Sequence, residues 1–213
     1  MISNNYLNLT IIYIIIMSQQ ESQNIQGHIF KACKSGKGTS YDVATVLYIM
    51  YRDKYMCISK VDKTSYYLND KNIWIKDNEL MFLRSKISTE LYRQFSKLCV
   101  TEQQWSLESD DNHAKNAAKI QKVMLRLKDN IKFKNDIMDQ SMELFYDFYQ
   151  KFVQKSDIIV FNNGIYDLEK EIFREIRPED YITKTIGLDY VDFSSTDPTV
   201  KKFIRVLLNK LSN

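Results

Sequence analysis

Residues 157–190 read DIIVFNNGIYDLEKEIFREIRPEDYITKTIGLDY, and this stretch decides the fold of the C-terminal third of the chain. Residues 157–161 have the apolar, β-branched composition of a strand, and residues 165–168 are expected to form a second strand with alternation. The Asn-Asn-Gly sequence at residues 162–164 is typical of a tight hairpin turn with left-handed backbone conformations. The sequence therefore predicts an antiparallel hairpin at this point.

A third strand is expected through Ile172, Phe173 and Ile176, after a polar turn at residues 169–171. Pro178 has no amide hydrogen for a central sheet ladder, so the meander should end there. Residues 179–190 are then expected to form a loop and a short strand.

Residues 79–156 have the periodicity of three amphipathic helices. The first should bury Leu80, Leu83, Ile87, Leu91, Phe95 and Leu98. The second has an apolar face made of Ala117, Ile120, Met124, Leu127 and Ile131. The third is predicted to start near Asp136 and to bury Met138, Met142, Phe145, Tyr149 and Phe152.

A helix followed by a small sheet is predicted over residues 41–75. Ser40 can cap the helix at 41–52, whose inner face would hold Val43, Val46, Leu47 and Met50. Strands are expected at 55–59, 65–68 and 73–75. The predicted fold is therefore α+β, with a mostly helical body, a small winged-helix-like helix and hairpin module, and a C-terminal antiparallel β-meander.

Basic residues gather at two places. Lys115, Lys119, Lys122 and Arg126 form a stripe on the second helix, nearly opposite its apolar face. Lys60 and Lys63 lie at the tip of the predicted wing. We expect both groups to contact DNA phosphates without sequence preference. Ordinary solvated lysines and a plain structural hairpin are the alternatives, and a net charge of +3 does not decide between them.

Four motifs in the C-terminal third resemble a known family. They are F-N-N-G-I-Y-D-L at 161–168, F-R at 173–174, R-P-E-D-Y-I-T at 177–183 and G-L-D-Y at 187–190. They resemble the region just before the superfamily 3 helicase module of poxvirus, giant-virus and phage or plasmid primase-helicases. A weaker resemblance extends upstream through residues 43–57, Trp74 and residues 83–88. In that family the region is a collar between primase and ATPase, implicated in hexamer assembly and in feeding DNA to the motor.

We interpret the motif residues mainly as architecture, because turn-forming residues usually have local roles. Arg174 and Arg177 are the members most able to reach a partner or a phosphate group. The full set is Asn163, Gly164, Tyr166, Asp167, Leu168, Phe173, Arg174, Pro178, Asp180 and Tyr181. Leu168, Phe173 and Tyr181 are expected to pack, and Asp167 to form local hydrogen bonds.

No catalytic centre is predicted for this chain. Its Gly36-Lys37 pair lacks the Ser or Thr and the opening glycine of a P-loop, so ATP and Mg²⁺ are expected only for the missing helicase module. A primase centre needs several converging carboxylates. Asp167 with Glu169 and Glu108 with Asp110 are the candidate pairs, but each is explained by a turn or by a helix start. No metal ligands or cofactors are therefore expected.

The chain has three cysteines, Cys33, Cys57 and Cys99, without a C-x-x-C pair. This indicates buried free thiols in a reducing, intracellular compartment, which the family resemblance would make the host cytoplasm or a viral factory. The apolar run at residues 7–17 is too short to span a bilayer, so no membrane association is expected. A short interfacial or partner-binding helix is the alternative for this run.

We expect three divisions of the chain. Residues 1–38 would be a leader, disordered or not native, with Met17 as a candidate true start. Residues 39–192 would form the collar-like domain. Residues 193–213 would be a helix leading towards an absent helicase module, with an apolar face that needs a partner.

The expected function is that of a non-catalytic, collar-like fragment of a viral primase-helicase that assists assembly, guides DNA, or both. Two alternatives remain. The chain could be part of a split ATP-dependent helicase whose motor is encoded elsewhere, or a stand-alone, sequence-independent DNA-binding adaptor. The expected partners are DNA and a helicase or primase subunit, with self-association as a further expectation.

Overall fold

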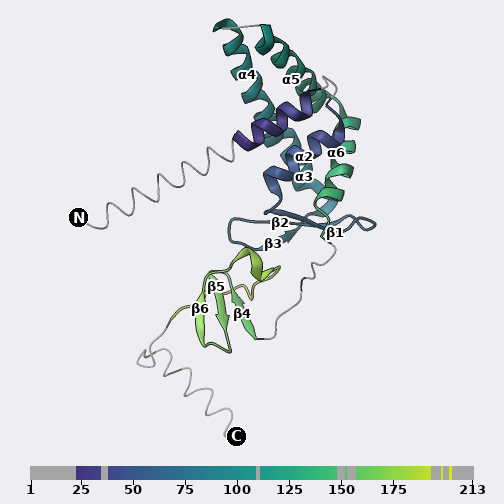
Figure 1. The fold of residues 1–213 in the computed structure, drawn as a ribbon. Coiled ribbons are helices and arrows are strands. Elements are labelled where there is room, and N and C mark those ends of the chain that lie inside the picture. The colour runs from purple at the N-terminus through teal and green to yellow at the C-terminus, as the bar shows by residue number, and fades with distance from the viewer. Residues whose placement is uncertain are drawn as a thin grey trace, which may run out of the picture. The chain divides into compact units, whose positions relative to one another are not determined.

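The computed structural model describes residues 23–34, 38–108, 111–147, 152 and 157–192, with the single positions 198 and 202. The chain divides into two compact units (Figure 1). Unit 1 comprises residues 1–69 and 74–151, and unit 2 comprises residues 70–73 and 152–213. The single collar-like domain expected at 39–192 is thus distributed over two units.

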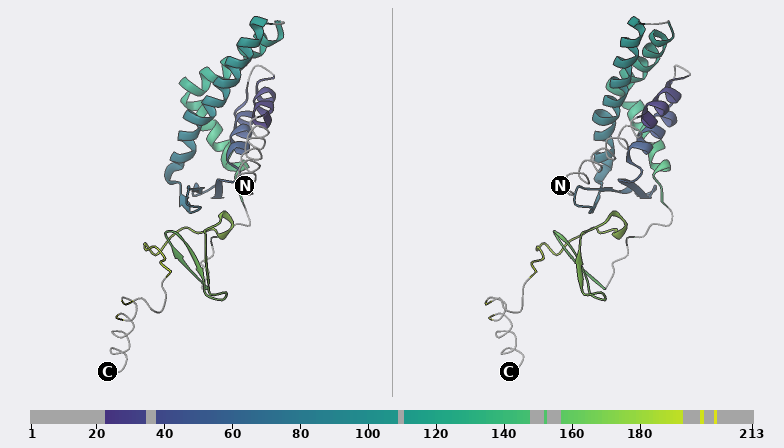
Figure 2. Two further views of the ribbon diagram at one scale, coloured as in Figure 1. Left: turned by 90° about the vertical axis from the view of Figure 1, so that its left-hand side faces the viewer. Right: turned by 60° about the vertical axis from the view of Figure 1, so that its left-hand side comes forward.

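Unit 1 is a bundle of helices with a small sheet at one end. The helices are a stretch at residues 23–33, α2 (Ser40–Tyr51), α3 (Met81–Lys86), α4 (Tyr92–Glu108), α5 (Asp111–Asp129) and α6 (Ile131–Leu144). A 3-10 turn, η1 (Asn78–Leu80), precedes α3, and a π-turn, η2 (Ile87–Leu91), joins α3 to α4. Helices α4 and α5 lie side by side over their length, and α2 packs on α6 (Figures 1 and 2).

The stripe predicted for the first helix is confirmed, because Leu80, Leu83, Ile87, Leu91, Phe95 and Leu98 are all buried. From Leu83 to Phe95 this stripe advances by four residues three times in succession. An α-helix has 3.6 residues per turn, so a run of fours would drift around its surface. The wider π-turn at Ile87–Leu91 takes up that drift and keeps the stripe facing the core.

The second and third helices differ from the prediction at their junction. Asn130 caps α6 by accepting a hydrogen bond from the Phe133 amide at 2.9 Å, so the third helix starts at Ile131 and not near Asp136. Ile131 is consequently 67% exposed at the start of α6, instead of closing the apolar face of α5.

Most other residues of the apolar faces predicted for the second and third helices are buried or half-buried. Ala117, Ile120 and Leu127 are buried on α5, together with Val123, while Met124 is half-buried. Met138, Met142 and Phe145 are buried, with α6 ending at Leu144. Phe152 is not helical, and Tyr149 lies outside the described residues.

Helix α2 begins one residue earlier than predicted. Thr39, and not Ser40, is its N-cap, because the Thr39 hydroxyl oxygen accepts from the Asp42 amide at 3.1 Å. The Asp42 carboxylate accepts in return from the Thr39 amide at 3.4 Å, which completes a capping box. Val43, Val46 and Leu47 are buried as expected.

The sheet of unit 1 has the predicted strands to within about one residue. Strands β1 (Tyr55–Ser59), β2 (Thr64–Leu68) and β3 (Trp74–Lys76) pair antiparallel in the order β1-β2-β3. The outer edge of β1 is covered, since Cys57 exchanges backbone hydrogen bonds with Phe145 and Asp147 at 2.9 and 3.0 Å. The exposed residues Lys60 and Lys63 occupy the β1–β2 turn, as the wing prediction placed them.

Part of the expected leader belongs to the folded body. Residues 23–33 are helical, and Ile25, Ile29, Ala32 and Cys33 from this stretch are buried in the core of unit 1. The prediction that residues 1–38 form a leader therefore fails for this stretch. The apolar run at residues 7–17 and the predicted C-terminal helix lie outside the described residues, apart from the helical positions Pro198 and Lys202.

The predicted free and buried state of Cys33, Cys57 and Cys99 is confirmed. Burial, assisted by the nearby Asp42 carboxylate, raises the pKa of the Cys33 thiol to about 12. Within the described ranges, none of the helices combines the length and the apolar composition that crossing a bilayer requires.

Unit 2 is built on the predicted meander. Strands β4 (Ile158–Phe161), β5 (Gly164–Asp167) and β6 (Ile172–Arg174) pair antiparallel in the order β4-β5-β6. A 3-10 turn, η3 (Pro178–Asp180), follows, and residues 181–192 continue without a regular strand. Among its described residues, the buried aliphatic side chains are Ile73, Ile165, Ile176 and Ile182.

The hairpin turn lies at the predicted position, but its backbone does not have the predicted left-handed conformation. Phe161 pairs with Gly164, so Asn162 and Asn163 form the turn, yet neither asparagine nor Gly164 has a positive φ. Position 164 requires glycine because a side chain would not fit against strand β6. A Cβ at this position would lie 2.3 Å from Cζ of Phe173 and 2.6 Å from the Arg174 carbonyl oxygen.

We predict that Gly164→Ala destabilises unit 2 by roughly 1–3 kcal/mol, because the added methyl group must push β6 away from β5. Gly27→Ala is the matched control, since a Cβ there would have no atom within 4 Å and alanine favours a helix. Hydrogen exchange of the β4 and β5 amides, followed by mass spectrometry, measures the effect. Equal protection in both variants would contradict the steric role of Gly164.

Candidate functional site

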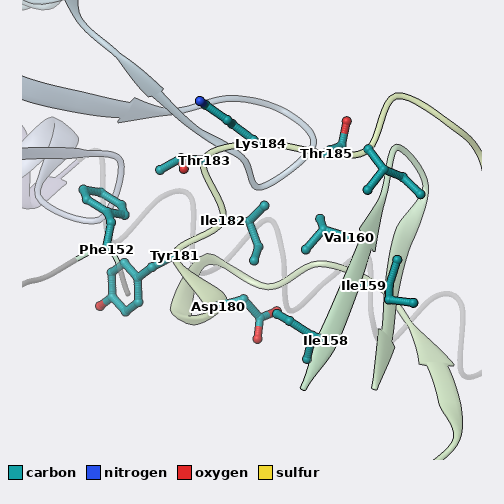
Figure 3. A pocket seen from close by; sticks show the side chains of 11 residues that line it. Phe152, Ile158, Ile159, Val160, Asp180, Tyr181, Ile182, Thr183, Lys184 and Thr185 are labelled. Carbon is teal, nitrogen blue, oxygen red and sulfur yellow. The ribbon is translucent and has the colours of Figure 1, made fainter. Parts of the chain in front are cut away.

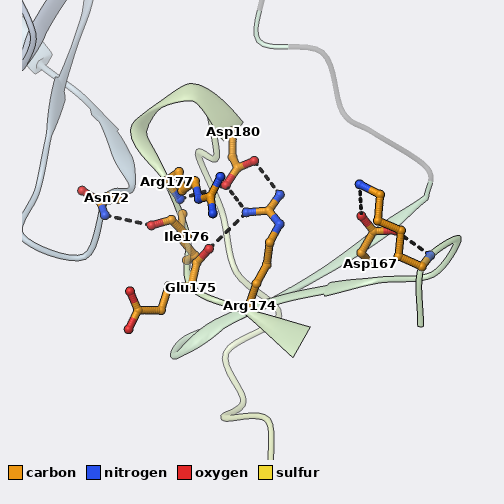
Figure 4. A network of polar contacts seen from close by, with 8 residues as sticks. Asn72, Asp167, Arg174, Glu175, Ile176, Arg177 and Asp180 are labelled. Carbon is orange, nitrogen blue, oxygen red and sulfur yellow. Dashed lines mark hydrogen bonds and ion pairs between the residues drawn. The ribbon is translucent and has the colours of Figure 1, made fainter. Parts of the chain in front are cut away.

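Arg174 and the backbone of Arg177 converge on the carboxylate of Asp180 (Figure 4). Arg174 donates to it twice, from Nη1 to Oδ2 and from Nη2 to Oδ1, each at 2.7 Å. The Arg177 amide donates to the same Oδ2 at 2.8 Å. The Asp180 side chain is only 9% exposed, and its hydrogen bonds and charge raise the pKa of Arg174. This arrangement fixes the turn η3 to strand β6.

Arg174 therefore differs from the role predicted for it. Its guanidinium binds Asp180 and also donates from Nη1 to the Glu175 carbonyl oxygen at 3.1 Å, so it is occupied within unit 2. Beside it, Asn72 Nδ2 donates to the Ile176 carbonyl oxygen at 2.8 Å. Arg177 is exposed and contributes its backbone amide to this network, so it is the more accessible of the two arginines.

Asp167 has the local role that was predicted. Its carboxylate accepts from the Lys170 amide at 3.0 Å and forms an ion pair with the Lys170 ammonium at 3.3 Å. The backbone hydrogen bond from Lys170 is the main cause that lowers the pKa of Asp167. Glu169 is an exposed turn residue. Among the described residues, no group of three or more His, Cys, Asp or Glu side chains could hold a metal ion.

The asparagine pair of the motif binds the G-L-D-Y segment, a role that the sequence did not indicate. Asn163 forms two hydrogen bonds with the backbone of Tyr190, from Nδ2 to the carbonyl oxygen at 2.9 Å and from the Tyr190 amide to Oδ1 at 2.8 Å. Asn162 Oδ1 accepts from the Thr185 hydroxyl at 2.7 Å. The turn thus clamps the chain that follows η3.

Backbone hydrogen bonds join the same segment to β4. The Ile186 amide donates to the Val160 carbonyl oxygen at 2.9 Å, and the Asn162 amide donates to the Leu188 carbonyl oxygen at 2.8 Å. Gly187, between the two, has φ +80°, a conformation that interrupts a regular strand. This explains why the short strand expected within residues 179–190 does not form.

Aromatic rings cover one face of the meander. Tyr190 stacks on Phe173 with 4.3 Å between ring centroids, and Phe161 and Tyr166 lie within 5.6 Å of the same tyrosine ring. The predicted packing of Phe173 is therefore confirmed. Leu168, in contrast, is 46% exposed, because it lies just beyond the end of β5.

A cavity of about 470 Å³ lies between β4 and residues 180–186 (Figure 3). Ile158 and Val160 line it on the β4 side, while Ile182 and the ring of Tyr181 line it on the other. Tyr181 is half-buried and meets Phe152 edge to face, with 6.1 Å between ring centroids. The lining is mixed, because Thr183, Lys184 and Thr185 lie beside these apolar side chains.

The basic stripe predicted on α5 is divided by the structure. Lys115 and Lys122 are exposed, but Lys119 Nζ donates to the Lys34 carbonyl oxygen at 3.2 Å. Arg126 Nη1 donates to the Gly38 carbonyl oxygen at 2.8 Å, and its guanidinium lies 3.6 Å from the ring centroid of Phe133. The exposed members of the stripe, Lys115 and Lys122, therefore alternate along α5 with two members that contact the protein.

The wing-tip lysines also differ from each other. Lys60 forms an ion pair with Glu143 at 3.7 Å and lies over the ring of Tyr146, whereas Lys63 is exposed. Contact of these lysines or of the α5 stripe with DNA stays a prediction.

Glu108 and Asp111 lie in α4 and α5, on either side of positions 109–110, which the structure does not describe.

Comparison with known proteins identifies the family. Residues 44–209 match the family described as D5 N terminal like. The chain belongs to this family. The matched range includes residues of both units, among them Asn162, Asn163 and Asp180.

Two viral proteins are similar to this member of the D5 N terminal like family. "Putative helicase L207/L206" of Acanthamoeba polyphaga mimivirus is 26% identical over 171 residues, which cover 78% of this chain and 18% of that protein. "Putative helicase 022R" of Frog virus 3 (isolate Goorha) is 26% identical over 191 residues, which cover 73% of this chain and 20% of that protein. The chain thus spans about one fifth of the length of each relative.

We predict that Asp180→Asn lowers the stability of unit 2 by about 1.5–3 kcal/mol, because hydrogen bonds to a charged partner are lost on a mostly buried group. Glu179→Gln, a change of the same size at the exposed neighbouring residue, should have little effect. The measurement is the rate of proteolysis within residues 157–192, with the fragments identified by mass spectrometry. Similar cleavage of the two variants would show that the Asp180 network does not stabilise the unit.

The lowered pKa of Asp167 predicts a specific acid response. A carboxyl whose folded pKa lies below the ordinary value of 3.8 stabilises the fold above that pH and loses its contribution as the pH falls through the folded pKa. A carbon-13 NMR titration of the side chain should therefore give a midpoint below 3.8. Lys170→Met should raise the midpoint only in part, because the Lys170 backbone amide remains. A midpoint above 3.8 in the unmodified protein would refute the assignment.

Proposed function

We propose that this chain is a non-catalytic, collar-like module of a viral DNA-replication primase-helicase, and that it assists assembly of the helicase, guides DNA, or both. The main support for this proposal is that side chains of the motif form hydrogen bonds within unit 2. Asn162, Asn163, Arg174 and Asp180 form hydrogen bonds with other parts of unit 2, which supports a scaffold role for the motif.

The family and the relatives support the choice of system. Membership of the D5 N terminal like family connects the chain with the N-terminal part of a primase-helicase, and both relatives are named as helicases. Because the chain covers only about one fifth of either relative, the motor activity of the complete protein would reside in a separate part. ATP and Mg²⁺ would accordingly belong to that part.

An assembly assay tests the proposal. The chain should be mixed with a superfamily 3 helicase module from the same source, and the mass of the complex measured by light scattering together with ATP hydrolysis. We expect the chain alone to hydrolyse no ATP, and the mixture to contain more of the assembled module and to hydrolyse ATP faster than the module by itself. Hydrolysis by the chain alone, or an unchanged mass and rate in the mixture, would contradict the collar role.

A second candidate is the stand-alone DNA-binding adaptor. The exposed lysines Lys115 and Lys122 favour it, since neither takes part in the contacts that hold Lys119 and Arg126 against the protein. A split helicase with its motor encoded elsewhere would give the same fold, and the assembly assay would then reconstitute a complete enzyme from two chains. In each case the three buried, free cysteines fit an intracellular, reducing compartment such as the host cytoplasm or a viral factory.

A further inference from the structure

Two segments of unit 1 bring positive charge to one surface, beside the neutral Ser88 of η2. Arg84 lies in α3, and Lys132 and Lys134 lie near the start of α6. Two hydrogen bonds cross between the segments. Arg84 Nη1 donates to Asn135 Oδ1 at 3.3 Å, and Lys134 Nζ donates to the Ser88 hydroxyl oxygen at 3.3 Å.

The two crossing hydrogen bonds bring Arg84 and Lys134 together, and Lys132 lies on the other side of Asn135 on α6. Arg84 and Ser88 are four residues apart, and Lys132 and Asn135 are three apart, so each pair shares a face of its own segment. The two crossing hydrogen bonds place these faces against each other, with Lys134 adjacent in sequence to Asn135. Lys132, Ser88 and Asn135 are exposed, while Arg84 and Lys134 are half-buried.

The cluster has no carboxylate that balances its charge. Throughout the described ranges, no Asp or Glu oxygen lies within 4.0 Å of the side-chain nitrogens of Arg84, Lys132 or Lys134. The nearby Glu90 carboxylate is already bound by Lys86 and Arg93.

The positions of the two lysines are also unfavourable for α6 itself. The first turn of this helix has no acidic residue, and cations near a helix start are repelled by the helix dipole. Asp136 and Asp139, further along α6, are not in ion-pair contact with them. The helix dipole therefore does not stabilise the two lysines at this end of α6, whereas it would favour an anion bound there.

The present partners of the cluster are neutral oxygens of an amide and a hydroxyl. A phosphate oxygen is a stronger acceptor for guanidinium and ammonium groups, so it can replace both without breaking an ion pair. Arg126 provides the contrast, because its guanidinium is held between the Gly38 carbonyl oxygen and the Phe133 ring.

We propose that Arg84, Lys132 and Lys134, with the hydroxyl of Ser88, bind the phosphodiester backbone of a nucleic acid. The guanidinium plane can take two phosphate oxygens, and the lysines supply point charges at either side. Such contacts fix position without reading sequence. The choice of nucleic acid as the ligand rests on the proposed replication function, whereas the location of the site rests on the cluster alone.

The test uses the full chain and a fluorescein-labelled single-stranded oligonucleotide of mixed sequence, with fluorescence anisotropy recorded across a salt series. The triple variant Arg84→Gln, Lys132→Gln, Lys134→Gln should lose at least about tenfold in affinity at low salt. Its plot of log affinity against log salt should be less steep by about 2, at roughly 0.7 per lost phosphate contact. A duplex of the same sequence is measured in parallel.

A charge-matched control triple, Lys31→Gln, Lys54→Gln, Lys97→Gln, removes the same charge from exposed residues elsewhere in unit 1 and should keep nearly the full affinity and slope. Circular dichroism of both triples establishes that each is folded, and Arg84→Lys, which keeps the charge, should retain part of the affinity. Equal losses in the two triples, or a loss that follows Lys115→Gln, Lys122→Gln instead, would overturn the site. Absence of binding by the unmodified chain at low salt would also overturn it.

The result of this DNA-binding test can be distinguished from the result of the assembly assay that tests the collar role. If DNA binding fails while the helicase module still assembles with the chain, the phosphate site is wrong and the proposed function stands. If DNA binding follows the cluster while assembly fails, the chain is an adaptor with a defined phosphate site.

Discussion

The paired hydrogen bonds between Arg174 and Asp180 are the constraint on which unit 2 depends. They join the last strand of the meander to the turn that follows it, and the same carboxylate also receives the Arg177 amide. From this turn the chain passes back along β4, where the asparagines of the hairpin bind it as far as Tyr190. A two-stranded hairpin is marginal in water, and a small sheet needs a third strand and a hydrophobic face to be stable. The returning segment supplies the aromatic cover that completes it.

Much of the secondary structure followed from the sequence, because the patterns involved are local. The apolar stripe from Leu80 to Leu98 and the strands of both sheets needed only periodicity and turn composition. The start of α6 differs from the prediction, although Asn130, directly before an apolar residue, is a recognisable N-cap residue. The spacing of the buried methionines alone indicates a helix start near residue 136, six residues after that cap.

The roles of individual side chains were harder to predict, because they depend on distant partners. Gly164 was singled out for backbone freedom, but its actual requirement is the approach of Phe173 from the next strand. Arg126 looked like part of a cationic face, and its partner Gly38 is 88 residues away in sequence. Arg174 looked accessible, although Asp180 lies only six residues ahead, and the Arg-Pro-Glu-Asp turn between them could have suggested the pairing.

The π-turn at Ile87–Leu91 has a consequence for how this helix tolerates insertions and deletions. Loss of one residue there would restore ordinary α-helical geometry and would appear harmless by helix propensity alone. Every position beyond it would, however, be rotated by about 100° relative to the preceding turn. Phe95 and Leu98 would then face water, and the pairing of α4 with α5 would lose its apolar seam. The π-turn therefore restricts changes in the length of the α3–α4 segment, just as the apolar stripe restricts changes in its composition.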